Sequence, residues 1–235
     1  MSAPDPLERR FADAQSLAGE LAVEIGADLA RAIESRGRAS LVVSGGRTPG
    51  RLFESLRTQD LDWSRVRIAL ADERWVEPDD PASNERLVRE TLLAGRAAAA
   101  DFAGMKNAAP TPDRGAVAAW ERFARVPRPF DVLLLGMGDD GHTASLFPGS
   151  PNLAAALDPA AAAGCVATWA PAAPQPRMSL NLAALLDSRR VLILITGEAK
   201  WRTYRAAAAP GPVAEMPVRA LLRQRRTRVE IAWAP

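Results

Sequence analysis

The chain has 235 residues, 48% hydrophobic and 25% charged, so it is long enough to bury a sizeable core and is ordinary in composition for a globular protein. Thirty basic residues against 28 acidic ones leave a formal net charge of +2, a near balance that argues against a nucleic-acid partner. The single cysteine excludes an intramolecular disulfide, and without a signal peptide or an apolar run of roughly 18 residues we expect a cytoplasmic protein with no membrane partner.

The predicted elements alternate between helices and short apolar strands. Apolar residues spaced four apart from Leu17 to Ile33 predict a helix over 5–35, which Gly37 ends. Strands are predicted over 39–43, 66–71, 130–135, 166–169, 191–196 and 229–233, and helices from Thr48-Pro49 and over 83–93, 115–124, 179–186 and 199–208. This alternation indicates the α/β class, with a doubly wound, mostly parallel sheet covered by helices on both faces, in one domain spanning 1–235.

A glycine-containing loop, Ser44-Gly45-Gly46-Arg47-Thr48-Pro49, joins the first predicted strand to a helix. Glycines let backbone N–H groups approach an anion closely, and the N-terminus of a helix adds partial positive charge. The loop is either a plain tight turn or an anion site, and the hydroxyls of Ser44 and Thr48 favour a phosphate. The Gly-Lys-Ser/Thr ending of a P-loop is missing.

Two further strand ends carry charged residues. Asp72-Glu73-Arg74-Trp75 ends the strand predicted over 66–71, where three consecutive charges are either solvated surface or part of a site. Lys200, one of only two lysines beside 28 arginines, opens the helix predicted over 199–208 and is a candidate phosphate contact. Arg177, just before the helix predicted over 179–186, is another candidate for binding an anion.

The only histidine, His142, follows the strand predicted over 130–135 in the segment Asp139-Asp140-Gly141-His142. Ligand crevices in open α/β sheets form at the carboxyl ends of strands, and a group that titrates near neutral pH is the usual general base or acid. A lone histidine is more often structural, but the neighbouring glycines and carboxylates favour catalysis. One histidine and no cysteine cluster offer no transition-metal site, so we expect neither metal nor cofactor.

The segment from Gly136 to Gly141 also matches the G-x-G-x-x-G pattern of dinucleotide-binding proteins. That motif needs a long helix directed at the pyrophosphate, whereas Pro148 and Gly149 end any helix here within about two turns. Asp139 and Asp140 would also repel the pyrophosphate. Nicotinamide binding is therefore disfavoured.

Six segments in this order resemble the 6-phosphogluconolactonases of the glucosamine-6-phosphate isomerase/6-phosphogluconolactonase superfamily. They are SGGRTP (44–49), ADERWV (71–76), Ser83-Asn84, LLLGMGDDGHTASLFPG (133–149), PRMSL (176–180) and TGEAKW (196–201). The resemblance implies hydrolysis of 6-phospho-D-glucono-1,5-lactone to 6-phosphogluconate, in the oxidative pentose phosphate pathway, by a doubly wound α/β domain. We expect the sugar-phosphate lactone as the small-molecule partner and a monomeric protein.

If the resemblance holds, His142 activates water, and Asp140 or Asp72 assists His142. Arg74 stabilises the developing oxyanion or binds the phosphate, and the remaining phosphate contacts are Ser44, Gly45, Gly46, Thr48, Arg177 and Lys200. The main alternative is the sister isomerase and deaminase acting on glucosamine 6-phosphate, which carries a glutamate five residues after the histidine, where this chain has Phe147. The isomerases also have an aromatic residue at the position of Arg74. A non-catalytic sugar-phosphate sensor is a third possibility, against which the general base argues.

Overall fold

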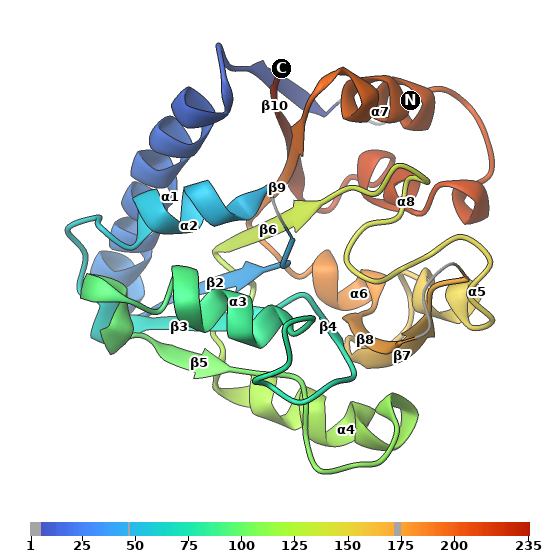
Figure 1. Cartoon of the computed structure of the whole chain (residues 1–235), viewed down its shortest axis with the longest axis horizontal. Coiled ribbons are helices and arrows are strands. Elements are labelled where there is room, and N and C mark those ends of the chain that lie inside the picture. Colours follow the sequence, from blue (N-terminus) through green and yellow to red (C-terminus); the bar gives the residue numbers. More distant parts are fainter. Residues whose placement is uncertain (1–5, 47, 172–174) are drawn as a thin grey trace.

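The computed structural model describes residues 6–46, 48–171 and 175–235, and a seven-stranded sheet runs through its centre (Figure 1). The strand order is β1-β10-β9-β6-β2-β3-β5, and every neighbouring pair is parallel. The bounds are β1 Leu7–Arg10, β2 Ala39–Val43, β3 Val66–Leu70, β5 Asp101–Ala103, β6 Val132–Gly136, β9 Arg190–Thr196 and β10 Arg228–Ala234. The central strands are apolar along their length because helices cover both of their faces.

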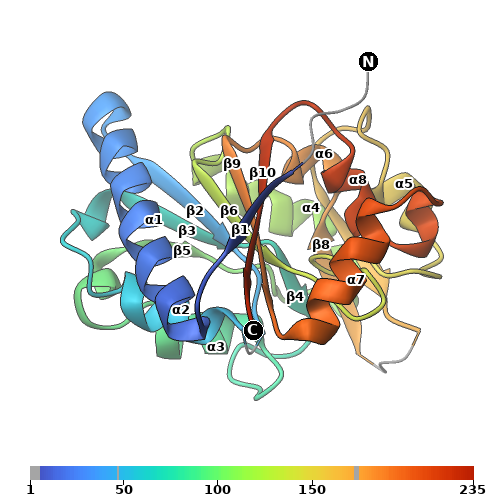
Figure 2. The ribbon, with the colours of Figure 1, turned by 90° about the horizontal axis from the view of Figure 1, so that it is seen from above.

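Helices lie on both faces of this sheet, with α1, α2 and α3 on one face and α7 and α8 on the other (Figure 2). The helices are α1 Ala14–Arg36, α2 Pro49–Leu56, α3 Asn84–Thr91, α4 Pro112–Arg122, α5 Leu153–Ala156, α6 Leu182–Leu185, α7 Glu198–Ala208 and α8 Val218–Leu222. Short 3-10 turns occur at Trp63–Arg65, Gly95–Ala99, Phe123–Arg125 and Val213–Glu215. The predicted α/β class with a doubly wound parallel sheet is therefore confirmed. Across the described ranges, no helix combines the length and the apolar character needed to cross a membrane.

A second sheet of three antiparallel strands, in the order β4-β8-β7, packs beside the main one. Its strands are β4 Asp72–Arg74, β7 Cys165–Trp169 and β8 Pro176–Leu180, and α4 packs against β7 and β8. The chain passes from β3 into β4 at Ala71, whose N–H donates to Val43 in the main sheet while its carbonyl accepts from Leu180 in β8. The second sheet is thus attached to the carboxyl end of β3.

The structure corrects two of the predicted helices. The helix predicted over 5–35 begins only at Ala14, with Asp13 as its N-cap, because Leu7–Arg10 pairs with β10 as an edge strand. The helix predicted over 179–186 shrinks to Leu182–Leu185, because Pro176–Leu180 pairs with both β4 and β7. In both cases pairing with a strand distant in sequence decides the structure. Position 5 and Arg47 lie outside the described residues.

The other predicted elements are present within a few residues, and Gly37 ends α1 in the left-handed conformation, as predicted. Thr48 is the N-cap residue of α2, but its side chain makes no capping hydrogen bond. Strand β5, at the edge of the main sheet, was not predicted because three residues are too short to show a pattern.

Candidate active site

A cavity of about 250 Å³ lies at the carboxyl ends of β2, β6 and β9, which are neighbours in the main sheet. Nine of the ten predicted site residues line it: Ser44, Gly45, Gly46, Thr48, Asp72, Arg74, His142, Arg177 and Lys200. The tenth, Asp140, does not line the cavity but contacts the His142 ring. The topology brings these residues together because parallel strands all end at one edge of the sheet.

The His142 imidazole is held by Asp140. Oδ1 of Asp140 accepts from the backbone N–H of His142 at 3.0 Å and lies 2.6 Å from Nδ1 of the ring. Burial raises the pKa of Asp140, but these hydrogen bonds outweigh it and the net shift is downward, so the carboxylate stays ionised. In a neutral imidazole, an ionised acceptor beside Nδ1 favours the tautomer that carries its proton on Nδ1, and Nε2 is then the nitrogen that can act as a base.

The surroundings of the ring fix its position. The Phe147 ring packs against His142 with 4.2 Å between ring centroids. A Cβ atom at Gly138 would lie 2.0 Å from Nδ1 of His142, so the backbone at this position passes too close to the imidazole for any side chain. Histidine, phenylalanine and glycine in this segment therefore form one packed unit.

Two arginines face the cavity from the second sheet without a carboxylate partner. Arg74 in β4 and Arg177 in β8 are directly opposite each other in the antiparallel ladder. Each has a buried Nε with no hydrogen-bond partner, and neither forms an ion pair with any described residue. Burial, together with the charge of Arg74, lowers the pKa of Arg177. Like charges opposite each other are destabilising, and an anion bound between the two guanidiniums would relieve that repulsion.

The glycine loop supplies further polar atoms. The Oγ of Ser44 is buried without a partner and lines the cavity, as does Asn84, whose Oδ1 is also unpartnered. A Cβ atom at Gly45 would lie 2.0 Å from that Oδ1, so the loop passes directly over the Asn84 amide. Four of the five buried side-chain atoms without a partner among the described residues thus belong to residues of this one cavity.

Asp72 and Glu73, adjacent in sequence, have different surroundings. Asp72 is buried at the cavity wall, where its Oδ2 accepts from the hydroxyl of Ser145 at 2.7 Å. Glu73 faces away and accepts hydrogen bonds from the Ser83 hydroxyl and from the backbone N–H groups of Arg74, Asn84 and Glu85. Burial raises the pKa of Glu73 to about 7 despite these four donors. Glu73 thereby attaches the start of α3 to β4.

Lys200 lies at the first turn of α7 and forms an ion pair with Asp139, with 2.9 Å between Nζ and Oδ1. Its side chain is 27% exposed, whereas that of Asp139 is 80% exposed. This contact gives the ammonium a carboxylate partner that a bound phosphate would have to replace or share.

Sequence reasoning missed Asn84 as a cavity residue, although it noted the Ser83-Asn84 pair. Asn84 donates from Nδ2 to the Asp72 carbonyl at 2.8 Å, which turns its amide oxygen toward the cavity. The remaining lining residues, which sequence reasoning did not assign, are Pro49, Gly136, Met137, Gly138, Ala144, Leu194 and Ile195. Among the described residues, no group of three or more His, Cys, Asp or Glu side chains is placed to hold a metal ion.

Residues 12–233 match the family of glucosamine-6-phosphate isomerases/6-phosphogluconolactonase. The chain belongs to this family. It is 44% identical to a 6-phosphogluconolactonase from Rhizobium meliloti, over 96% of this chain and 97% of the relative, and 46% identical to one from Pseudomonas aeruginosa, over 92% and 89%. A crystal structure of a 6-phosphogluconolactonase from Shewanella baltica superposes with a TM-score of 0.96 at 47% identity, with both chains fully covered.

Membership of the glucosamine-6-phosphate isomerase/6-phosphogluconolactonase family confirms the resemblance inferred from the six segments. The structure of a monomeric glucosamine-6-phosphate deaminase also superposes, with a TM-score of 0.75 over 97% of each chain, but at 18% identity. That likeness concerns the fold alone. The two activities therefore have to be distinguished by the residues around His142.

Proposed function

We propose that the protein hydrolyses 6-phospho-D-glucono-1,5-lactone to 6-phosphogluconate. The observation that carries the proposal is that one cavity brings together an imidazole with an ionised acceptor on Nδ1 and two half-buried guanidiniums that have no carboxylate partner among the described residues. Lactone hydrolysis needs both parts, a base for water and cationic donors for the oxyanion and the phosphate. Relatives 44% and 46% identical carry the corresponding name.

In the proposed mechanism, Nε2 of His142 takes a proton from water as the water oxygen attacks the lactone carbonyl carbon. The carbonyl oxygen becomes an oxyanion, which Arg74 stabilises if Arg177 binds the phosphate. When the bond between the carbonyl carbon and the ring oxygen breaks, the imidazolium returns the proton to that oxygen, and the carboxylic acid formed loses its own proton to solvent to give the carboxylate product. Asp140 stabilises the imidazolium in between, as a carboxylate does in hydrolase triads.

The phosphate is assigned to the glycine loop, Arg177 and Lys200. Backbone N–H groups near the start of α2, the Ser44 hydroxyl and the Arg177 guanidinium are suited to bind a dianion. Binding energy from the phosphate then positions the lactone carbonyl near His142. Phosphate binding by Lys200 would weaken its ion pair with the exposed Asp139.

The alternative activity, isomerisation and deamination of glucosamine 6-phosphate, is disfavoured by Phe147. The resemblance places the glutamate that assists ring opening at this position, whereas here a buried phenyl ring packs on His142. A ring without an ionisable group cannot transfer a proton. A non-catalytic sensor is also disfavoured, because binding alone does not require the His142–Asp140 pair.

A coupled assay tests the proposal. Glucose 6-phosphate is oxidised by glucose-6-phosphate dehydrogenase, and disappearance of the lactone is followed with and without the protein, since the lactone also hydrolyses spontaneously. We expect acceleration of hydrolysis and no release of ammonia or fructose 6-phosphate from glucosamine 6-phosphate. Comparable turnover of glucosamine 6-phosphate would reverse the assignment, and tight binding of 6-phosphogluconate without turnover would favour the sensor.

Three further expectations belong to the proposal. We take 1–235 as one domain because residues from both sheets line one cavity, and we expect a cytoplasmic protein because its proposed substrate is a phosphorylated sugar derivative. We also expect a monomer. A sedimentation experiment at assay concentrations tests this last expectation.

A further inference from the structure

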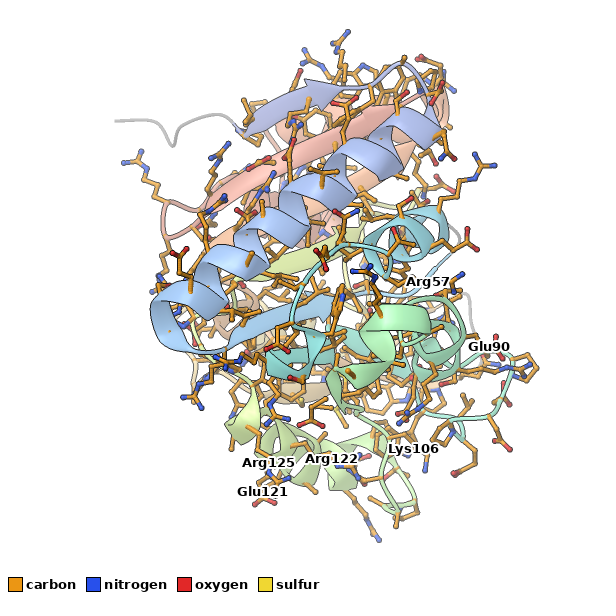
Figure 3. The ribbon with its side chains drawn as sticks, turned by 90° about the vertical axis from the view of Figure 1, so that its left-hand side faces the viewer. Arg57, Glu90, Lys106, Glu121, Arg122 and Arg125 are labelled. Atoms are coloured by element: carbon orange, nitrogen blue, oxygen red, sulfur yellow. The ribbon has the colours of Figure 1, made fainter. Side chains whose placement is uncertain are left out.

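A second, larger cavity of about 680 Å³ lies between α3, the edge strand β5 and α4 (Figure 3). It is separate from the candidate active site, and the two share no lining residue. Its volume falls within the range typical of small-molecule pockets. Its walls carry five cationic side chains, Arg67, Arg89, Lys106, Arg122 and Arg125, and the half-buried ring of Phe102.

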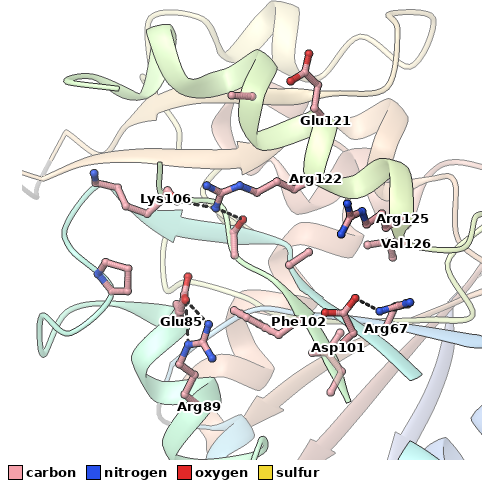
Figure 4. A pocket seen from close by; sticks show the side chains of 15 residues that line it. Arg67, Glu85, Arg89, Asp101, Phe102, Lys106, Glu121, Arg122, Arg125 and Val126 are labelled. Atoms are coloured by element: carbon pink, nitrogen blue, oxygen red, sulfur yellow. Dashed lines mark hydrogen bonds and ion pairs between the residues drawn. The ribbon is translucent and has the colours of Figure 1, made fainter. Parts of the chain in front are cut away.

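Some of these cations already have carboxylate partners. Arg67 pairs with Asp101, Arg89 donates twice to Glu85, and Lys106 pairs with Glu77. The third carboxylate of the cavity wall, Glu121, forms no ion pair with a described residue, and its side chain is directed away from Arg122 and Arg125 (Figure 4). Within the described part of the chain, two cations of this cavity therefore form no ion pair, Arg122 and Arg125.

Arg122, the last residue of α4, and Arg125, in the 3-10 turn that follows, both extend toward β5 (Figure 4). Arg122 uses only Nη1 to donate to the carbonyls of Gly104 and Lys106, at 3.2 and 2.8 Å, so its Nε and Nη2 are available to a ligand. Arg125 makes no hydrogen bond or ion pair within the described parts of the chain. Two guanidiniums on one wall, one of them fixed in place by backbone carbonyls, form a site suited to phosphate groups.

The opposite wall is partly apolar and flat. The Phe102 ring lies beside Ile68 and Ala103 in the cavity lining, and the Arg89 guanidinium lies over it, 5.0 Å from the ring centroid. Arg89 is held in that position by its two hydrogen bonds to Glu85. An aromatic ring and a fixed planar guanidinium offer a stacking surface for a flat group.

We propose that this cavity binds a small phosphorylated ligand that carries a flat ring, the chemistry of a nucleotide. Its phosphates contact Arg122 and Arg125, and its ring lies against Phe102 and Arg89. The proposal does not depend on the activity at the first cavity. The two cavities are nevertheless adjacent, because Asn84 lines the first and the next residue, Glu85, lines the second.

Binding of magnesium-free ATP to the purified full chain, measured by titration calorimetry, tests the proposal. Inorganic tripolyphosphate serves as the probe for charge alone, and adenosine as the probe for the ring alone. We expect ATP to bind more tightly than either. Equal affinity of tripolyphosphate and ATP would overturn the role of the Phe102 wall, and no binding of ATP would overturn the site.

Variants locate the bound ATP. Arg125→Ala removes an exposed cation without a partner, and we expect it to weaken ATP binding about tenfold or more, the effect of a lost charge-assisted contact. Arg114→Ala is the matched control, because it removes the same charge from an exposed position of α4 that does not line the cavity. Equal effects of the two variants would indicate non-specific attraction and overturn the proposal. Loss of ATP binding in Arg177→Ala but not in Arg125→Ala would place the ligand in the first cavity and also overturn it.

Discussion

Replacing Gly45 by alanine places a methyl group where the Asn84 side chain lies. The new Cβ would be 2.0 Å from Oδ1 and 2.4 Å from Cγ of Asn84. Asn84 is only 2% exposed, so its amide cannot swing into solvent, and any shift disturbs the 2.8 Å hydrogen bond from Nδ2 to the Asp72 carbonyl. The substitution therefore acts on two loops of the candidate active site at once.

The magnitude follows from two contributions. Overpacking of a buried site typically costs about 1–3 kcal/mol, and loss of a neutral hydrogen bond about 0.5–1.5 kcal/mol. We expect Gly45→Ala to lower the free energy of unfolding by about 1.5–4.5 kcal/mol in sum. Because both residues line the cavity, we also expect kcat/KM for the lactone to fall by ~10–100-fold, as for a small misplacement of binding groups.

Chemical denaturation and the coupled lactonase assay measure the two effects. Gly50→Ala is the control, because a Cβ atom there meets nothing within 4 Å, and we expect it to stabilise α2 by about 0.4–1 kcal/mol. In the double variant with Asn84→Ala the contacts with Oδ1 and Cγ are gone and only a 3.0 Å approach to Cβ remains, so its destabilisation should be smaller than the sum of the two single effects. Strict additivity, or a Gly45→Ala variant as stable as wild type, would refute the steric argument.

Four other substitutions test the remaining assignments. His142→Ala should lower kcat by ~10²–10⁴ while binding of 6-phosphogluconate persists, and a variant with most of its kcat would place the base elsewhere. Lys200→Ala should weaken 6-phosphogluconate binding ~10–100-fold without changing the residual rate of hydrolysis of unphosphorylated gluconolactone. Asp139→Asn removes the carboxylate that pairs with Lys200 and should tighten 6-phosphogluconate binding. If Lys200→Ala lowered the activity on both lactones equally, a phosphate role for Lys200 would be contradicted. The folded pKa of Glu73, about 7, is above its ordinary 4.5, so its contribution to stability is fully present below pH 4.5 and is lost as the pH rises through 7. Relative to Glu73→Gln, wild type should therefore lose about 3 kcal/mol of unfolding free energy between these pH values, and parallel pH curves would show that Glu73 does not titrate there.

The sequence predicts the main sheet well because its strands are short, apolar and separated by helices with clear periodicity. Strands β2, β6 and β9 carry continuous apolar runs, and the residues that follow them were identified as site residues for that reason. The second sheet was not predictable in the same way. β8 reads as the start of a helix, and only its pairing with β4 and β7 makes it extended.

The candidate site shows the same limit. Sequence reasoning assigned Arg74 and Arg177 to the site separately, but their position opposite each other depends on the register of β4 and β8. It identified His142 as the only histidine, at the end of a predicted strand, and Asp140 as a carboxylate just before it, whereas the role of Asn84 follows from the passage of Gly45 over its amide, a contact between two loops. Contacts between segments far apart in sequence leave no local pattern, so these features required the structure.

The pairing of β1 with β10 has a consequence for how the chain folds during synthesis. The first strand of the sheet lies at its edge beside the last one, with Leu7 opposite Glu230 (Figure 2). A growing chain emerges from the ribosome N-terminal end first, so β1 must wait unpaired until more than two hundred further residues have been made. Once β10 has been synthesised, it pairs with β1 on one side and with β9 on the other, so that one strand completes this edge of the sheet. Nascent chains that stop before Arg228 would expose two unpaired strand edges, which makes them preferred clients of chaperones and prone to aggregate.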